Sequence, residues 1–280
     1  MKQKMCDLLG MFAVLALVAG CTSMPNPDAG KSGNIEVWWL GQSAMRITTV
    51  SGKVIMIDPW ITTNPKTPPQ YKNLEVLGKV DLILVTHGHG DHFGDAPALA
   101  KKNNVAVWGP AGLNQAAITL GILPPALSQR FGKGGTITPL GPNIKITATH
   151  AEHSSELLWI NPATKKAESH IGGEPVGFII ELENGFKIYH MGDTGVFGDM
   201  KLIGEYYKPD LIMIPIGGHF VMDPKDAAYA TNNLLKPRFA IPMHYGTNPF
   251  LKGTPKEYMD ALGNSSTKVF PINPGDKLRF

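Results

Sequence analysis

Apolar runs alternate with turn-rich and amphipathic segments along most of this chain. Short apolar runs bounded by turn residues predict strands at 35–40, 44–50, 54–57, 81–85, 105–108, 144–149, 175–182, 186–190, 211–214, 239–241 and 268–270. Amphipathic segments predict helices at 96–102, 113–120, 224–235 and 257–262. The polar stretch 161–174 is predicted to be a loop that contains His170. This alternation predicts an α/β fold with two strand-rich halves.

The first twenty residues follow a different pattern. Lys2 and Lys4 precede the uncharged run 8–20, which is too short to span a bilayer and is typical of a signal peptide. The run ends in a segment that resembles the lipobox of bacterial lipoproteins, Leu17-Val18-Ala19-Gly20-Cys21. Lipid on Cys21 would anchor the exported protein to a membrane. An ordinary cleavage site with an incidental cysteine is the alternative.

Residues 1–20 are thus predicted to be a lipoprotein signal peptide, residues 21–33 a flexible tether rich in Pro, Ser, Gly and Asn, and residues 34–280 one folded domain. By resemblance to lipoprotein sorting, Thr22 after the cysteine predicts the periplasmic side of the outer membrane, if the organism has one.

The cysteine content agrees with export, and the charge balance gives no support for binding to nucleic acid. Cys6 would leave with the signal and Cys21 would carry lipid, so the mature domain has no free thiol or disulfide. Removal of Lys2, Lys4 and Asp7 leaves 24 basic and 22 acidic residues. No basic run or aromatic stacking motif accompanies this balance, so nucleic-acid binding is not expected.

The segment Thr-His-Gly-His-Gly-Asp-His at 86–92 concentrates the candidate chemistry. It follows a predicted buried strand, where clustered polar groups destabilise a fold unless they are paired. A metal ion would supply that partner, because His and Asp are ligands for zinc and related ions. His87 and His89 can point the same way from extended backbone. Asp91 and His92, beyond a glycine-rich turn, are placed to reach a second ion.

His-x-His-x-Asp-His after a buried strand resembles the signature of the metallo-β-lactamase superfamily. This resemblance covers about 35–280 and implies a four-layer αβ/βα sandwich. Many relatives have His where this chain has Gln42, which leaves the role of that residue open. Other segments resemble landmarks of the metal-dependent hydrolases similar to ascorbate-6-phosphate lactonase: Gly41-Gln42-Ser43, Ile57-Asp58-Pro59-Trp60, Gly192-Asp193-Thr194, Pro215-Ile216-Gly217-Gly218 and Pro242-Met243-His244-Tyr245.

The resemblance also implies the remaining ligands. Asp193 matches the aspartate that bridges both metals in the family, and His244 matches the last ligand. His150 and His153 both follow the predicted strand 144–149; His153 is favoured because His153-Ser154-Ser155 resembles the family motif more closely. The implied sets are His87, His89 and His153 for one ion and Asp91, His92 and His244 for the other, with Asp193 shared.

Three further polar residues are candidates for supporting roles. His190 is predicted to be buried and to orient a ligand carboxylate. His219 is predicted either to contact substrate or to pack in a loop or the core. Asp58 is predicted either to hydrogen-bond a metal-ligating histidine or to cap a turn.

The implied chemistry is hydrolysis at two divalent ions, with zinc as first choice and manganese or iron as alternatives. A metal lowers the pKa of bound water from ~15.7 to about 7, so no separate base is needed. Asp91 and Asp193 are therefore the expected catalytic residues, as metal ligands. The ions keep a small net positive charge, which favours a small anionic ester, lactone or phosphodiester.

Other functions remain as alternatives. By resemblance, true β-lactamases lack the bridging aspartate and flavodiiron enzymes have Glu at the position of His89, so neither activity is expected. A lipid phosphodiesterase of the phospholipase-D-like type is one alternative, and a non-catalytic metal-binding lipoprotein is the other. An apolar groove beside the metals would favour the lipid enzyme, and a small polar pocket would favour a lactonase or sugar-phosphate esterase.

Overall fold

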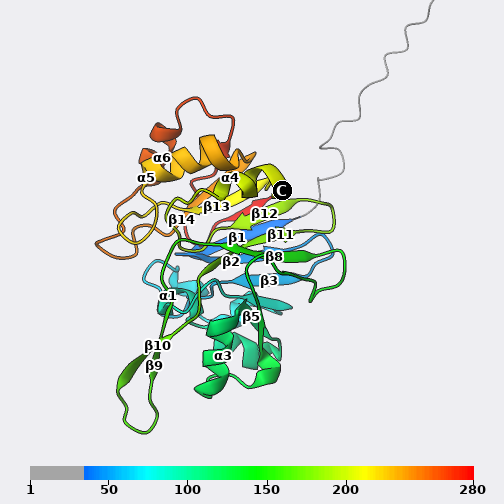
Figure 1. Ribbon diagram of the computed structural model, residues 1–280, viewed down its shortest axis with the longest axis vertical. Helices are drawn as coiled ribbons and strands as arrows, with labels where there is room; N and C mark the ends of the chain where they lie inside the picture. Colours follow the sequence, from blue (N-terminus) through cyan, green and yellow to red (C-terminus); the bar gives the residue numbers. More distant parts are fainter. Residues whose placement is uncertain (1–34) are drawn as a thin grey trace, which may run out of the picture.

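The computed structural model describes residues 35–280. The predicted signal peptide, Cys21 and the tether lie outside the described residues. Two seven-stranded sheets form the centre of the domain (Figure 1). The first sheet has the order β16 (Lys277–Arg279), β1 (Glu36–Gly41), β2 (Ala44–Thr48), β3 (Val54–Ile57), β4 (Leu82–Leu84), β5 (Val107–Pro110) and β6 (Ser128–Phe131).

The second sheet has the order β15 (Lys268–Val269), β14 (Phe239–Met243), β13 (Leu211–Pro215), β12 (Lys187–His190), β11 (Val176–Glu181), β8 (Lys145–His150) and β7 (Thr136–Ile137). A separate hairpin consists of β9 (Glu156–Ile160) and β10 (Ala167–Ile171).

The α-helices are α1 (Gly90–Phe93), α2 (Ala96–Asn103), α3 (Ala111–Thr119), α4 (Met200–Leu202), α5 (Pro224–Tyr229) and α6 (Pro255–Leu262). Short 3₁₀ turns are η1 (Pro69–Tyr71), η2 (Leu74–Leu77) and η3 (Pro125–Leu127), and π-helical turns are η4 (Ile203–Tyr207) and η5 (Ala230–Leu235). Within residues 35–280, none of these helices has both the length and the apolar character needed to cross a membrane.

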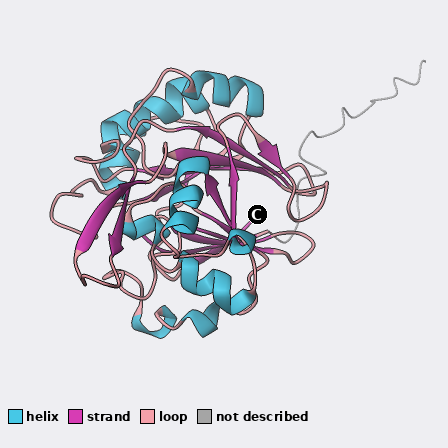
Figure 2. Ribbon diagram, turned by 60° about the horizontal axis from the view of Figure 1, so that its bottom comes forward, coloured by secondary structure: helices cyan, strands magenta, loops and turns pink. Residues whose placement is uncertain are grey.

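Three apolar clusters hold the layers together. One cluster lies between the sheets and joins Trp39 of β1 to Phe178 of β11. A second joins the first sheet to α2 and α3, and a third joins the second sheet to α5 and α6. Figure 2 shows helices outside two layers of strands. The predicted four-layer αβ/βα sandwich is therefore confirmed.

Most of the elements predicted from apolar runs are present with boundaries shifted by one or two residues. The loop prediction for 161–174 was wrong, because this stretch contains β10 and places His170 in a strand. The hairpin extends from the body (Figure 1), so its strands need no regular apolar face toward a core. The helix predicted at 224–235 changes from α5 to the π-helical turn η5 at Ala230.

Strand ends on the two sheets bring the candidate residues to one edge of the sandwich. The 86–92 segment follows β4, which pairs in parallel with β3 and β5. Asp193 and His244 follow β12 and β14, and both of these strands pair in parallel with β13. Since parallel strands present their carboxyl ends at the same edge, residues distant in sequence meet there.

Candidate metal centre

Three imidazoles, His87, His89 and His153, form a cluster that we call the histidine group. His87 and His89 follow β4, and His153 follows β8. His89 Nδ1 is 2.9 Å from His87 Nε2 and 3.3 Å from His153 Nε2. Three ring nitrogens therefore face one another, as the ligands of a tetrahedral ion do.

Hydrogen bonds on the outer side of these rings assign the tautomers. His89 Nε2 is 2.7 Å from Glu156 Oε2, and a carboxylate only accepts, so His89 Nδ1 keeps its lone pair. Thr86 Oγ1 donates to Asp58 and therefore accepts from His87 Nδ1 at 3.0 Å, which leaves a lone pair on His87 Nε2. Two lone pairs that face each other at 2.9 Å repel, so this donor set fits a cation between them.

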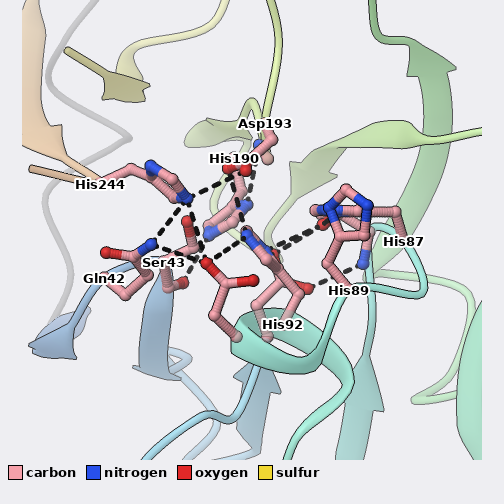
Figure 3. Close-up of polar contacts among 12 residues, drawn as sticks. Gln42, Ser43, His87, His89, His92, His190, Asp193 and His244 are labelled. Atoms are coloured by element: carbon pink, nitrogen blue, oxygen red, sulfur yellow. Dashed lines mark hydrogen bonds and ion pairs between the residues drawn. The ribbon is translucent and has the colours of Figure 1, made fainter. Parts of the chain in front are cut away.

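The second cluster, the aspartate–histidine group, consists of Asp91, His92, Asp193 and His244. Asp91 and His92 lie on α1, and the other two residues follow β12 and β14. His244 Nε2 is 2.9 Å from Asp193 Oδ2, and His92 Nε2 is 3.2 Å from Asp193 Oδ1. Figure 3 shows His92, Asp193 and His244 pointing toward one another from these separate elements.

The donor atoms of this group also fit a metal. His92 Nε2 and Asp193 Oδ1 are buried, and apart from the 3.2 Å ion-pair contact with each other they have no hydrogen-bond partner within residues 35–280. Buried polar atoms are normally satisfied, and a divalent ion would satisfy both. Asp193 Oδ2 is 3.6 Å from His153 Nε2, so this carboxylate contacts members of both groups.

The two groups differ in protonation. Burial lowers the pKa of His244, but the Asp193 carboxylate outweighs this effect and raises it to about 9. Burial also opposes the charge on His92, yet Asp193 and Asp91 hold its pKa well above the ordinary value. In contrast, burial and the nearby His92 keep the pKa of His87 well below the ordinary value. The metal-free protein therefore carries its imidazole protons mainly in the aspartate–histidine group.

Metal uptake by the aspartate–histidine group is expected to release about two protons at neutral pH, because bound imidazoles must be deprotonated. His92 and His244 have raised pKa values, so both are protonated near neutral pH and affinity for this ion should rise by about 100-fold per pH unit in that range. Burial lowers the pKa of His153, as it does for His87, so the histidine group should release fewer protons. Calorimetry in buffers of different ionisation enthalpy measures how many protons each group releases when it binds its ion. Equal proton release from the two groups would contradict the protonation states described above.

One buried carboxylate, Asp58, contacts the aspartate–histidine group directly and the histidine group through Thr86. Its Oδ2 is 2.8 Å from His92 Nδ1, so His92 donates there and Nε2 is the nitrogen that faces Asp193. Asp58 also accepts hydrogen bonds from the Thr86 amide and hydroxyl, each at 2.7 Å, and Thr86 in turn orients His87. Of the two roles predicted for Asp58, the structure shows the hydrogen bond to a candidate ligand.

Replacement Asp58→Asn is expected to lower metal affinity and activity by about 10–100-fold, as for other groups that orient metal ligands. The matched variant Thr86→Val removes the hydroxyl that links Asp58 to His87 but leaves the Asp58–His92 hydrogen bond and the Thr86 amide in place, so it should weaken the histidine group more than the other. Zinc affinities from competition with a chelating dye distinguish the two variants. Affinities equal to wild type in Asp58→Asn would show that this carboxylate does not orient the ligands.

The other candidate histidines lie outside both groups. Both nitrogens of His150 lie 3.3 Å from surface groups, Lys133 Nζ and Glu152 Oε2. His190 Nε2 donates to the Ser43 carbonyl, and its Nδ1 accepts from the Gly192 amide. His190 is buried as predicted, but within residues 35–280 its ring bonds to backbone atoms that hold the turn before Asp193 and not to a ligand carboxylate.

His219 belongs to an aromatic cluster at the rim of the site. Its ring stacks on Phe250 with centroids 4.9 Å apart and meets Phe220 edge-on at 4.4 Å. Of the two roles predicted for His219, these contacts favour packing.

The contacts of two polar residues of the site were not predicted. Gln42 Nε2 donates to Asp91 Oδ2 at 2.7 Å and lies 2.8 Å from His244 Nε2, and Gln42 Oε1 accepts from Thr247. Glu156, at the base of the β9–β10 hairpin, fixes His89. Gln42 was singled out in the sequence without a role, whereas nothing in the sequence around Glu156 indicated its contact.

A cavity of about 490 Å³ opens above both groups. His89, Asp91, Asp193 and His244 reach its surface, so a molecule in the cavity can touch both groups. The remaining wall is mixed, with polar Ser154, Thr247 and Asn248 and aromatic Trp60 and Phe220. The volume and mixed lining suit a small molecule.

Known proteins resemble this chain in sequence and fold. Residues 53–245 match the beta-lactamase superfamily domain. A "UPF0173 metal-dependent hydrolase" of Polaromonas sp. strain JS666 is 60% identical over 277 residues, which cover 96% of this chain and 100% of that protein. A protein of Cupriavidus metallidurans with the same description is 62% identical over 250 residues, covering 89% of this chain and 86% of the other. Igni18, described as a novel metallo hydrolase from Ignicoccus hospitalis, superposes with a TM-score of 0.73 at 32% identity, covering 88% of this chain and 98% of that structure.

Proposed function

The chain belongs to the UPF0173 family of metal-dependent hydrolases in the beta-lactamase superfamily, and from this premise we propose that it hydrolyses an anionic ester, lactone or phosphodiester at two divalent ions. The observation that carries the proposal is the contact of Asp193 with both clusters, at 3.6 Å from His153 and 2.9 Å from His244. Two ions held on either side of one carboxylate would be close enough to act on one bond.

The residues of the two groups would hold these ions. His87, His89 and His153 offer three nitrogens to one, and Asp91, His92 and His244 offer a carboxylate and two nitrogens to the other. When bound, two such ions supply hydroxide near neutral pH and stabilise the charge that develops on the substrate. Zinc suits this donor set best, and manganese or iron are alternatives.

The protein's own groups prepare the site for this reaction. Asp58 and Glu156 accept hydrogen bonds from the outer nitrogens of His92 and His89, so the inner nitrogens of these rings are the ones that would face the ions. Gln42 fixes Asp91 through its amide. Asp91 and Asp193 offset only part of the charge of two ions, so the cavity would favour an anionic substrate.

A hydrolysis screen tests the proposal. The metal-loaded protein is expected to cleave an activated ester, a lactone or bis(4-nitrophenyl) phosphate, and a cephalosporin should remain intact. Chelation should remove the activity and added metal should restore it. The rate should rise with pH through an apparent pKa near ~7. Background rates on every substrate with zinc, manganese and iron would refute hydrolysis of these classes.

A further inference from the structure

Large exposed apolar side chains gather on one face of the β9–β10 hairpin. Leu158, Ile160 and Ile171 are 65%, 57% and 86% exposed. Leu158 pairs with Ser169, and Ile160 pairs with Ala167. Because side chains alternate across a strand, these residues share one face with Glu156. We call Leu158, Ile160, Ala167 and Ile171 the hairpin face.

One residue of the opposite face anchors the hairpin to the protein, and the others contact each other. Leu157 is buried in the cluster beneath the first sheet, and within the hairpin the Trp159 ring of β9 lies 5.7 Å from that of His170 in β10. The side chains of the opposite face therefore have contacts of their own, whereas the hairpin face is apolar surface that the rest of residues 35–280 leaves largely exposed. Contiguous exposed apolar surface of this kind marks binding sites.

The hairpin face begins at the metal centre. Glu156 Oε2 is 2.7 Å from His89 Nε2 and accepts a hydrogen bond from Ser154 at 3.0 Å, and both of these residues line the cavity. A strand rises about 3.3 Å per residue, so Leu158 and Ile160 lie about 7 and about 13 Å farther along β9 than Glu156. Figure 1 shows the hairpin extending away from the body on the side of α1, which carries Asp91.

The cavity has apolar walls of its own. Phe220 lines it and is 51% exposed, and Phe250, which packs against His219 and Phe220, is 57% exposed. Trp60 adds a further aromatic wall. A polar, metal-binding floor with aromatic walls, and an apolar hairpin face that starts two residues beyond Glu156, match a molecule that has a polar reacting group and a hydrocarbon chain.

We propose that the substrate is amphiphilic, with its scissile ester or phosphodiester in the cavity and a hydrocarbon chain lying along the hairpin face. The inference rests on the proposed function and specifies its substrate class. The reaction is ordinary hydrolysis: water adds across the ester bond, the acyl or phosphoryl group takes the hydroxyl, and the leaving oxygen takes the proton.

The inference is tested by hydrolysis rates on substrates of different chain length, each kept below its micelle-forming concentration. The substrates are 4-nitrophenyl acetate, octanoate and dodecanoate, and methyl and dodecyl 4-nitrophenyl phosphate. Each buried methylene contributes about fourfold to binding, so partial burial should raise kcat/KM for the long chains at least about tenfold. In the triple variant Leu158→Ser, Ile160→Ser, Ile171→Ser, the ratio of long-chain to short-chain kcat/KM should fall to about one. A matched triple variant at exposed apolar residues that do not line the cavity should keep the wild-type ratio: Val50→Ser, Val76→Ser and Leu202→Ser.

Binding of dodecyl phosphonate and methyl phosphonate, measured by calorimetry, provides a readout that does not depend on turnover. Tighter binding of the dodecyl compound to wild type, lost in the hairpin variant, is expected even if none of the esters is cleaved. Cleavage of short substrates without a chain-length preference would overturn the inference and leave the proposed hydrolase function intact. The hairpin variant could instead lose binding to phosphatidylglycerol vesicles and keep the preference for long monomeric substrates. That result would show that the hairpin face binds a bilayer, and it would also overturn the inference.

Discussion

Asp193→Ala is expected to lower the rate of hydrolysis by about 10³-fold or more, the upper range for loss of a group that stabilises reacting charge. This carboxylate is 3% exposed and contacts both groups, through His153 on one side and His92 and His244 on the other. Its loss removes a ligand from both ions at once. Metal content by mass spectrometry should fall together with activity.

Asp193→Asn is the matched control for shape. Asparagine fills the same volume but lacks the charge that holds the pKa of His244 at about 9. Circular dichroism should show that both variants are folded, and both should lose most of their activity. Full activity in Asp193→Asn, with two ions bound, would show that the charge of the bridge is not required.

His153→Ala is expected to reduce metal affinity of the histidine group by more than about 100-fold, because a direct ligand contributes more than the groups that orient ligands. His153 Nε2 faces His89 Nδ1 at 3.3 Å. His150→Ala is the control from the same region, since its nitrogens contact Lys133 and Glu152. It should change affinity less than twofold.

Zinc competition and metal analysis of the two purified variants decide whether His150 or His153 is the ligand. A larger loss of metal affinity in His150→Ala than in His153→Ala would require His150 to move into the site and would contradict the arrangement described above. Equal, small losses would show that the histidine group does not bind metal.

The sequence predicts well the parts of this site that follow buried strands. The apolar run before His87, and those before Asp193 and His244, identify strand ends, and residue type then indicates metal chemistry. Parallel pairing of β12, β13 and β14 brings those ends together. The sandwich follows from the same apolar runs together with the resemblance of the motif.

Contacts made across the fold could not be predicted in this way. Glu156 reaches His89 only because the hairpin folds beside α1, and residues 161–174 lack the apolar alternation that would have indicated a strand. Thr86 lies in the motif, but its link between Asp58 and His87 depends on the approach of β3 and β4. Such details depend on tertiary packing, which local patterns do not encode.

The most direct measurement is a titration of the metal-free protein with zinc in which bound metal and hydrolysis are recorded on the same sample. Two ions per chain should bind, because His87, His89 and His153 form one donor set and Asp91, His92, Asp193 and His244 form another. Activity should appear mainly with the second equivalent and reach its plateau at two. Saturation at one ion, or hydrolysis that does not depend on added metal, would contradict a reaction at a two-metal centre.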